Sequence, residues 1–293
     1  MIIPVDKPSG YTSHDVVARI KHVVPGKIKI GHTGTLDPMC TGVLTVLTEN
    51  YTRLSDILPS DKTYRASILF GIRTDTQDVT GTVIETCDCD VSEAEFSSVA
   101  DKFTGNISQL PPMYSAVKKN GVPLYKLARE GVEVERQHRT VTIYSIDDIE
   151  KTGKNSFSFT VSCSSGTYIR TLCEDMAVEL GVCGCMQALR RTRANGFDIG
   201  QALNLEDVIR IASEGNIGKV GFRCEEVFSF LPAISIPDSG KVYYLNGGGI
   251  EKGRFGALPV GERFRAYDGD QRFLGLAGLN EEGKVCGIWK ENL

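Results

Sequence analysis

Strand-like and helix-like segments are mixed along this chain, without the regular alternation that builds a doubly wound parallel sheet. Segments rich in β-branched and aromatic residues predict strands at Tyr64–Phe70, Val141–Tyr144 and Phe157–Val161. Apolar residues at helical spacing predict helices between Thr12 and Val24 and between Tyr168 and Leu180. This mixture predicts an α+β fold.

The last sixty or so residues have a different pattern from the rest of the chain. Short alternating segments at Arg263–Tyr267, Phe273–Leu276 and Val285–Trp289 are separated by turn signals such as Asp268-Gly269. They predict a small β domain, which we expect to be a compact barrel. The predicted domains are therefore residues 1–231 and 232–293.

The composition sets broad limits on the kind of protein. With 293 residues, 41% of them hydrophobic, the chain can bury a large core and a small one. It has no apolar run near eighteen residues, and its first residues lack the pattern of a signal peptide. We therefore expect a soluble cytoplasmic protein with no membrane association.

The charge of the chain is unevenly distributed. The net charge is −4, which by itself disfavours phosphate binding. Residues 74–101, however, hold eight acidic side chains and no basic one, whereas residues 102–145 hold seven Lys or Arg against three Glu. Either these are two ordinary solvated surfaces, or one face attracts a polyanion that the other repels.

The nine cysteines are an odd number, and two close pairs, Cys87/Cys89 and Cys183/Cys185, have a Cys-x-Cys spacing. Zinc ribbons instead use Cys-x-x-Cys. The four histidines lie far from these pairs in the sequence. A metal site is the alternative reading, but we expect reduced thiols and no metal.

Glycines and an Asp-Pro step are concentrated between Gly31 and Leu44. Pro38 disfavours helical dihedral angles at Asp37, and the glycines permit tight turns, so the carboxylate is expected on a rigid loop. Such a carboxylate can act as a nucleophile toward a sugar C1′ or an electron-poor ring carbon. It can equally be a turn former. No nucleotide-binding loop or zinc-protease motif is present in the sequence.

The segment Gly31-His32-Thr33-Gly34-Thr35-Leu36-Asp37-Pro38 resembles the signature of the TruB family of tRNA pseudouridine synthases. Further motifs of that family follow in the same order at Asp6–Gly10, Lys62–Arg65, Arg73–Thr76, Gln109–Ala116, Gly166–Thr171 and Leu189–Arg193. Together they span most of residues 2–200. The resemblance implies a cofactor-independent isomerase that converts uridine 55 in the tRNA T loop, with Asp37 as nucleophile.

The resemblance also implies roles for three other side chains. Tyr64 would stack on the flipped base and take part in proton removal, Arg170 would pair with Asp37, and Leu189 would form an apolar pocket wall. Without the family pattern, these residues read as a sheet-packed tyrosine, a surface arginine and a core leucine.

Further RNA contacts are implied at Lys7, His32 and Tyr168, with His32 inserting into the T loop. Residues 105–139 resemble an RNA-gripping insertion of the family, which contains Lys118, Lys119, Lys126, Arg129 and Arg136. The implied fold is a mixed, mostly antiparallel sheet flanked by helices. The implied C-terminal unit is a PUA-like RNA-binding barrel.

One segment departs from the family pattern. After the Asp37 loop the chain reads Thr48-Glu49-Asn50-Tyr51-Thr52-Arg53, where the family commonly has Gly-x-Ala-Thr-Lys. We expect altered packing there rather than lost activity, because Arg53 could replace the lysine charge.

Three other functions remain open from the sequence. The first is tRNA chaperoning, which could coexist with catalysis. The second is a guide-RNA-dependent synthase, although the insertion at 105–139 favours a stand-alone enzyme. We expect a monomer without an obligate protein partner. The third is a glycosidase, which would need a second acid across the scissile bond.

Overall fold

The computed structural model describes residues 1–119, 121–256 and 258–291. A ten-stranded mixed sheet runs in the order β14-β1-β3-β12-β4-β11-β10-β7, with β2 paired to β3 and β13 to β12. Two of its pairings, β1 with β14 and β3 with β12, are parallel and the rest are antiparallel. The predicted mixed, mostly antiparallel sheet is confirmed. Its strands are β1 (Ile2–Lys7), β2 (Ile30–Thr33), β3 (Thr41–Thr48), β4 (Lys62–Phe70), β7 (Gly105–Gln109), β10 (Arg139–Lys151), β11 (Ser156–Cys163), β12 (Gly184–Ala194), β13 (Phe197–Asp198) and β14 (Leu203–Asn204).

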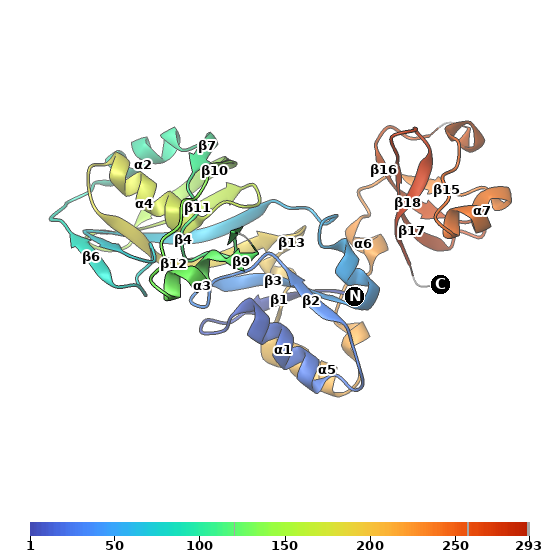
Figure 1. Ribbon diagram of the computed structural model, residues 1–293, viewed down its shortest axis with the longest axis horizontal. Helices are drawn as coiled ribbons and strands as arrows, with labels where there is room; N and C mark the ends of the chain where they lie inside the picture. Colours follow the sequence, from blue (N-terminus) through green and yellow to red (C-terminus); the bar gives the residue numbers. More distant parts are fainter. Residues whose placement is uncertain (120, 257, 292–293) are drawn as a thin grey trace.

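Two helices pack beside each other at one end of this sheet, below β1 and β3 in Figure 1. They are α1 (Ser13–Val23) and α5 (Leu205–Ser213). The predicted helix start is confirmed for α1, where the Thr12 side chain accepts from the Asp15 N–H at 3.0 Å. The Asp15 carboxylate accepts from the Thr12 N–H in return, which completes a capping box.

The helices α2 (Glu93–Lys102) and α4 (Ile169–Glu179) cover the other end of the sheet. Phe96 of α2 packs against Phe70 and Phe157 of the sheet, with ring centroids 5.5 and 5.2 Å apart. The three predicted strand segments fall inside β4, β10 and β11, so these predictions are confirmed. The second predicted helix is confirmed as α4.

Two small hairpins project from this body. The first pairs β5 (Ile72–Thr74) with β6 (Val83–Thr86), and the second pairs β8 (Lys118–Lys119) with β9 (Val122–Pro123), followed by α3 (Leu124–Arg129). Of the helices described, none is long and apolar enough to cross a membrane.

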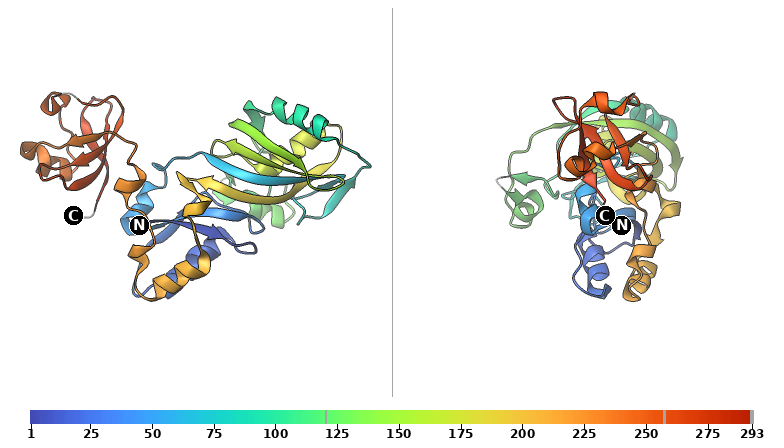
Figure 2. Two further views of the ribbon diagram at one scale, coloured as in Figure 1. Left: turned by 180° about the vertical axis from the view of Figure 1, so that it is seen from behind. Right: turned by 90° about the vertical axis from the view of Figure 1, so that its right-hand side faces the viewer.

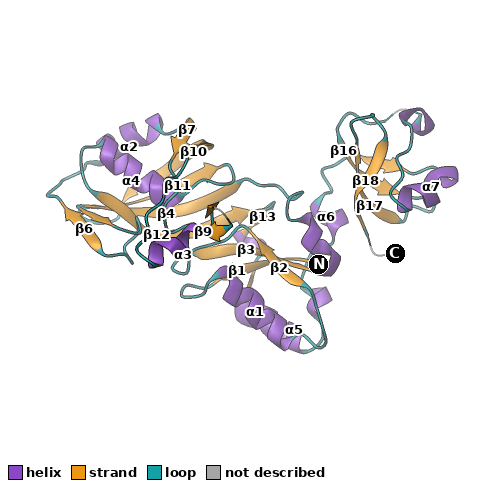
Figure 3. Ribbon diagram, viewed as in Figure 1, coloured by secondary structure: helices purple, strands orange, loops and turns teal. Residues whose placement is uncertain are grey.

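The C-terminal unit lies at one end of the elongated molecule, as Figures 2 and 3 show. Its four-stranded sheet runs β15 (Ala233–Ser235), β16 (Arg263–Tyr267), β17 (Phe273–Leu279) and β18 (Val285–Lys290), with α7 (Asp238–Leu245) beside it. The three predicted strands are confirmed as β16, β17 and β18. Among the described residues, no pairing joins β15 to β18, so the sheet is open and the expected closed barrel is not found.

The segment that departs from the family pattern contacts the C-terminal unit. It forms a 3-10 helix, η1 (Glu49–Leu54), in which the Tyr51 ring lies edge-on to Trp289, with centroids 5.1 Å apart. The Asn50 side chain donates to the Lys290 carbonyl at 2.6 Å, and the Trp289 indole donates to the Asn50 carbonyl at 3.2 Å. The segment that departs from the family pattern therefore joins the catalytic domain to the C-terminal unit. Arg53 is exposed at the end of this turn.

Candidate functional site

The Asp37 loop joins β2 to β3 and is tied to the start of the chain. Lys7, at the end of β1, is completely buried, and its ammonium donates to the carbonyls of Pro8, Tyr11 and Pro38 at 2.9, 2.6 and 3.2 Å. The Gly10 N–H also donates to the Pro38 carbonyl, at 2.8 Å. These contacts hold the residue after Asp37. They support a positioning role for Lys7, and its expected RNA contact stays a prediction.

A glycine lets this loop enter the sheet. Gly42 has φ +105°, a region that favours glycine, and it lies opposite Arg191 of β12. A Cβ atom there would lie 2.1 Å from the Arg191 carbonyl oxygen. Close approach of β3 to β12 therefore requires a residue without a side chain.

Arg191 holds the other side of the loop from inside the protein. Its side chain is completely buried, and it donates from Nε to the Val43 carbonyl and from Nη2 to the Gly34 carbonyl, both at 2.7 Å. It also lies near Tyr64 of β4. Burial raises the pKa of Tyr64 to about 12, although the Arg191 charge opposes that shift. The Tyr64 phenol is therefore protonated at neutral pH.

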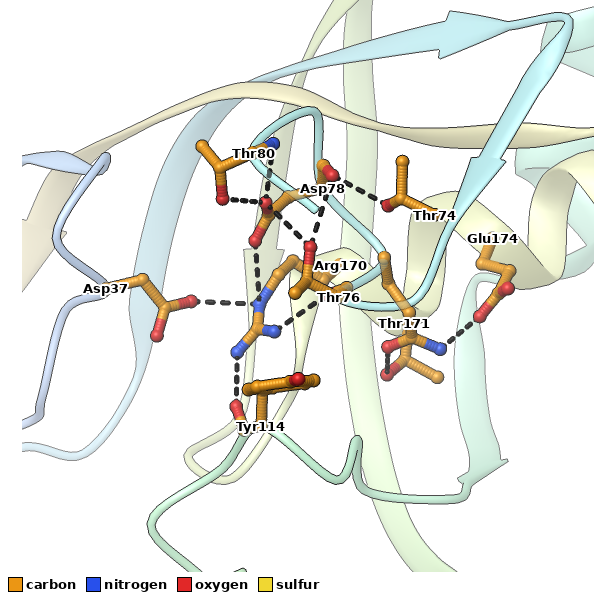
Figure 4. A network of polar contacts seen from close by, with 10 residues as sticks. Asp37, Thr74, Thr76, Asp78, Thr80, Tyr114, Arg170, Thr171 and Glu174 are labelled. Carbon is orange, nitrogen blue, oxygen red and sulfur yellow. Dashed lines mark hydrogen bonds and ion pairs between the residues drawn. The ribbon is translucent and has the colours of Figure 1, made fainter. Parts of the chain in front are cut away.

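Arg170, at the start of α4, makes an ion pair with Asp37, with 2.9 Å between Nε and Oδ2 (Figure 4). Its side chain is only 5% exposed, whereas that of Asp37 is 37% exposed. The two terminal nitrogens donate to the carbonyls of Thr76 and Tyr114, each at 2.8 Å. The guanidinium is therefore fixed in orientation with one edge toward Asp37.

A second carboxylate, that of Asp78, lies behind the guanidinium, with 3.8 Å between its Oδ2 and Arg170 Nε. Asp78 is buried in the loop between β5 and β6. Its Oδ1 accepts from the Thr76 hydroxyl at 3.0 Å and from the Thr80 N–H at 2.9 Å. Figure 4 shows this threonine cage around Asp78. Arg170 is thus held between two carboxylates, of which only Asp37 reaches the cavity.

The pKa of Asp37 is raised above its usual value. Burial is the largest cause, and the nearby Asp78 charge adds to it, whereas the Arg170 guanidinium and Lys7 oppose it. Arg170 therefore limits the rise of this pKa without cancelling it. Arg170 is paired with Asp37, as the family resemblance implies, but burial has the larger effect on the pKa of Asp37.

A cavity of about 230 Å³ opens in front of Asp37. Five residues predicted from the sequence line it, namely Asp37, Tyr64, Tyr168, Arg170 and Leu189. Its volume is below the roughly 300–1,000 Å³ typical of drug-sized ligand sites, and it suits a single base. Within the part of the chain that the structure describes, Asp37 is the one acidic residue in its lining.

His32 lies on β2, outside this lining. It is half-buried, and its Nδ1 has no hydrogen-bond partner among the described residues. Burial and the Arg191 charge lower its pKa, which favours the neutral ring at physiological pH. Its expected insertion into RNA stays a prediction.

The basic residues of the insertion lie around a separate cavity of about 390 Å³ or on α3. Lys118, Lys119 and Arg136 line that cavity, and Lys126 and Arg129 are exposed on α3. The insertion also reaches the Asp37 cavity, which Ser115 and Ala116 line. The insertion is therefore continuous with the Asp37 site, and its RNA contacts stay predictions.

Sequence reasoning missed three buried polar residues that support the site. Asp78 and Arg191 are described above, and Gln109 is the third. Its side chain accepts from the Tyr168 N–H at 3.1 Å and donates to the Tyr168 carbonyl at 3.2 Å. Gln109 and Arg191 fall inside motifs quoted for the family resemblance, and that was the only signal for them in the sequence. The run of threonines around Asp78 was a weak signal for a turn.

Comparison with known proteins identifies the family. The N-terminal domain of the TruB family of pseudouridylate synthases matches residues 21–169, and the tRNA pseudouridylate synthase B C-terminal domain matches residues 170–217. The tRNA pseudouridine synthase B of Geobacter sulfurreducens is 41% identical over 270 residues, covering 90% of this chain and 88% of the relative. That of Clostridium perfringens is 37% identical over 286 residues, covering 96% of each.

A solved structure described as a Cbf5-Nop10-Gar1 complex has a TM-score of 0.71 and 27% identity, covering 99% of this chain and 84% of that one. A second, of an H/ACA RNP bound to a substrate RNA, has a TM-score of 0.69 and 25% identity, covering 99% and 83%. The fold is therefore the pseudouridine synthase fold. The chain belongs to the TruB family of pseudouridylate synthases, and its enzymatic class is that of an isomerase.

Proposed function

We propose that the chain isomerises uridine 55 in the T loop of tRNA, as a monomer and without a guide RNA or protein partner. The observation that carries the proposal is a single carboxylate, Asp37, facing a base-sized cavity and held by Arg170 at 2.9 Å. The names of the relatives support tRNA as the substrate.

In the proposed reaction the uridine leaves the loop and enters the cavity between Tyr64, Tyr168 and Leu189. Aromatic stacking of about 1–3 kcal/mol offsets part of the cost of flipping a base. The Asp37 carboxylate bonds to C1′ or to ring C6, and the N1–C1′ bond breaks. C1′ then bonds to C5, the bond between Asp37 and the nucleotide breaks, and N1 takes up a proton. Loss of the C5 proton completes the isomerisation. Because the Tyr64 phenol is protonated, its oxygen can take this proton only after losing its own.

The geometry disfavours a glycosidase. Two carboxyl groups must flank the scissile bond of a sugar, about 5–9.5 Å apart. In the part of the chain that the structure describes, Asp37 is the one acid lining the cavity, and Asp78 lies behind Arg170. The described geometry therefore offers no second acid across the cavity.

Release of tritium from a tRNA transcript labelled at uracil C5 tests the proposal. We expect the wild type alone to release about one tritium per tRNA, and both Asp37→Ala and Asp37→Asn to release none while binding tRNA normally. Asp101→Asn, at an exposed position on α2, is the matched control and should be fully active.

Turnover by either Asp37 variant would show that Asp37 is not the nucleophile. Tight tRNA binding without release by the wild type would instead favour a chaperone or a guide-dependent enzyme. Addition of a guide RNA would then separate those two functions.

We also propose that residues 232–293 form a PUA-like RNA-binding domain. The basic residues Lys252 and Arg254 are exposed in this unit and offer phosphate contacts. Replacing both with alanine should weaken tRNA binding without changing single-turnover chemistry at saturating enzyme. Unchanged affinity for tRNA would mean that these two residues do not contact the RNA, and it would contradict an RNA-binding role for this unit.

A further inference from the structure

Three of the nine free cysteines lie together outside the Asp37 cavity. Cys87 directly follows β6, and Cys183 directly precedes β12. The Cys183 N–H donates to the Cys87 sulfur at 3.0 Å, which places the two residues side by side. Cys89, two residues further along, also lies near Cys87. The fold therefore brings together one cysteine from each Cys-x-Cys pair, Cys87 from the first and Cys183 from the second.

A small cavity gives access to this pair. It has a volume of about 280 Å³, and both Cys87 and Cys183 line it. Arg73 and Glu85, which form an ion pair at 2.8 Å, are also in the lining. Cys87 is partly exposed and Cys183 is buried, so a small molecule in the cavity reaches the Cys87 sulfur more readily. Glu174 also lines the cavity, so Arg73 is its one cation against two carboxylates, and the lining gives no preference for an anionic reagent.

We propose that Cys87 and Cys183 form a reversible redox pair, in which Cys87 accepts a low-molecular-weight thiol as a mixed disulfide and Cys183 displaces it. The inference does not depend on the proposed function, because neither cysteine lines the Asp37 cavity.

The reaction balances with an external disulfide as the oxidant. The Cys87 thiolate attacks one sulfur of the external disulfide, forming a mixed disulfide and releasing one thiolate. The Cys183 thiol then loses its proton to Glu85 or water and attacks the Cys87 sulfur, releasing the second thiolate. The protein loses two electrons and the external disulfide gains them. Burial, together with the nearby Cys87 and Glu85, raises the pKa of Cys183 to about 12, which fits its place as the second thiol to react.

The bond would connect two segments that hold Arg170. The β5–β6 hairpin, which precedes Cys87, carries Thr76 and Asp78. Cys183 follows the helix α4, which carries Arg170. The Gly71 backbone already bridges the two segments, accepting from the Cys87 N–H at 3.0 Å and donating to the Cys183 carbonyl at 2.8 Å. Oxidation would therefore lock an existing contact, closing a long loop of the chain.

Glutathione disulfide is the probe for the test. After treatment of the full chain and alkylation of free thiols, non-reduced peptide mapping should show Cys87 linked to Cys183, with two of the nine thiols lost. The midpoint of thermal unfolding should rise by about 5 °C, because the link restricts the unfolded chain, and a reductant should reverse the rise. A link between Cys87 and Cys89, no link at Cys87, or a lower midpoint would overturn the proposal.

Two variants test the order of the steps. Cys183→Ser should retain one glutathione on Cys87, whereas Cys87→Ser should take up none at Cys183. Cys286→Ser, in the C-terminal unit, is the control and should still form the link. Glutathione retained on Cys183 in the Cys87→Ser protein would contradict the assigned order.

Discussion

Burial and the neighbouring Asp78 both disfavour the negative charge on Asp37. Burial raises its pKa, and Arg170 offsets part of that rise through an ion pair at 2.9 Å. Asp78 has the opposite effect on Asp37, but it also lies close to Arg170 and helps to neutralise that buried cation. The network therefore fixes Arg170 firmly while leaving Asp37 less stable as a carboxylate than an exposed aspartate.

This balance predicts the acid limb of the activity profile. In the proposed mechanism Asp37 reacts as the carboxylate, so single-turnover tritium release should fall as the pH drops through its raised pKa. Removing the cation in Arg170→Ala should raise that pKa further and move the limb to higher pH, with a rate loss of about 100-fold or more at neutral pH. Arg170→Lys should move the limb less. If neither variant moves the acid limb, Arg170 does not influence the pKa of Asp37.

The same shift predicts a stability effect with a definite sign. A carboxyl group whose folded pKa is raised destabilises the folded state above that pKa, and the penalty disappears as pH falls through it. Asp37→Asn should therefore be at least as stable as the wild type at neutral pH, and the difference should shrink in acid. Thermal unfolding across this pH range measures it. A clear loss of stability at neutral pH would mean that the ion pair outweighs burial.

Sequence patterns could locate Asp37 but not the residues around it. The Gly-rich loop and the Asp-Pro step are local features, and so they are visible in one window of sequence. Asp78, Gln109 and Arg191 act through contacts between residues far apart in the chain, and no local pattern indicates that a strand arginine will be buried. The family resemblance supplied Tyr64 and Arg170, whose residue types alone predicted ordinary packing and surface positions.

At the scale of the elements, the pairing of β3 with β12 decides whether the Asp37 loop is in place. Gly42→Ala puts a Cβ atom 2.1 Å from the Arg191 carbonyl at a φ of +105°, so the strands must separate. We expect a loss of about 3 kcal/mol in the free energy of unfolding and a large loss of activity. Gly10→Ala has a similar backbone strain, at φ +85°, but no neighbour within 4 Å, and should cost about 1 kcal/mol. If urea unfolding shows the same loss in the free energy of unfolding for Gly42→Ala and Gly10→Ala, the close approach of β3 to β12 is not what requires glycine at position 42.

The insertion that carries β8, β9 and α3 is the second element with a testable role. Lys118 and Lys126 are exposed, whereas Lys119 donates to the Glu135 carbonyl at 2.8 Å. Replacing the three lysines with alanine should weaken tRNA binding and reduce the slope of log affinity against log salt by about 2 to 3. Lys102→Ala with Lys154→Ala is the control at exposed positions elsewhere. An unchanged slope in the triple variant would place the RNA surface on another element.

Across the whole molecule, the open C-terminal sheet depends on the catalytic body for part of its packing. Leu276 and Trp289 belong to the same buried cluster as Ile2, Tyr51 and residues near the junction of the two units. The sequence predicted three of the four strands of this unit, because they alternate. It could not predict the open sheet, because closure depends on pairing between distant strands rather than on local alternation.

The Tyr51–Trp289 contact should determine how firmly the two units are joined. Tyr51→Ala removes the ring that lies against Trp289 and should cost about 3 kcal/mol in the free energy of unfolding. Tyr51→Phe keeps the ring and loses only the hydroxyl contacts to Glu291, so it should cost about 1 kcal/mol. If the C-terminal unit binds RNA, Tyr51→Ala should weaken binding of whole tRNA while leaving turnover of an isolated T stem-loop unchanged, since Tyr51 is not among the residues that line the Asp37 cavity. An equal loss of activity on both substrates would show that η1 supports the catalytic body itself, and the joint between the units would then have no separate part in RNA recognition.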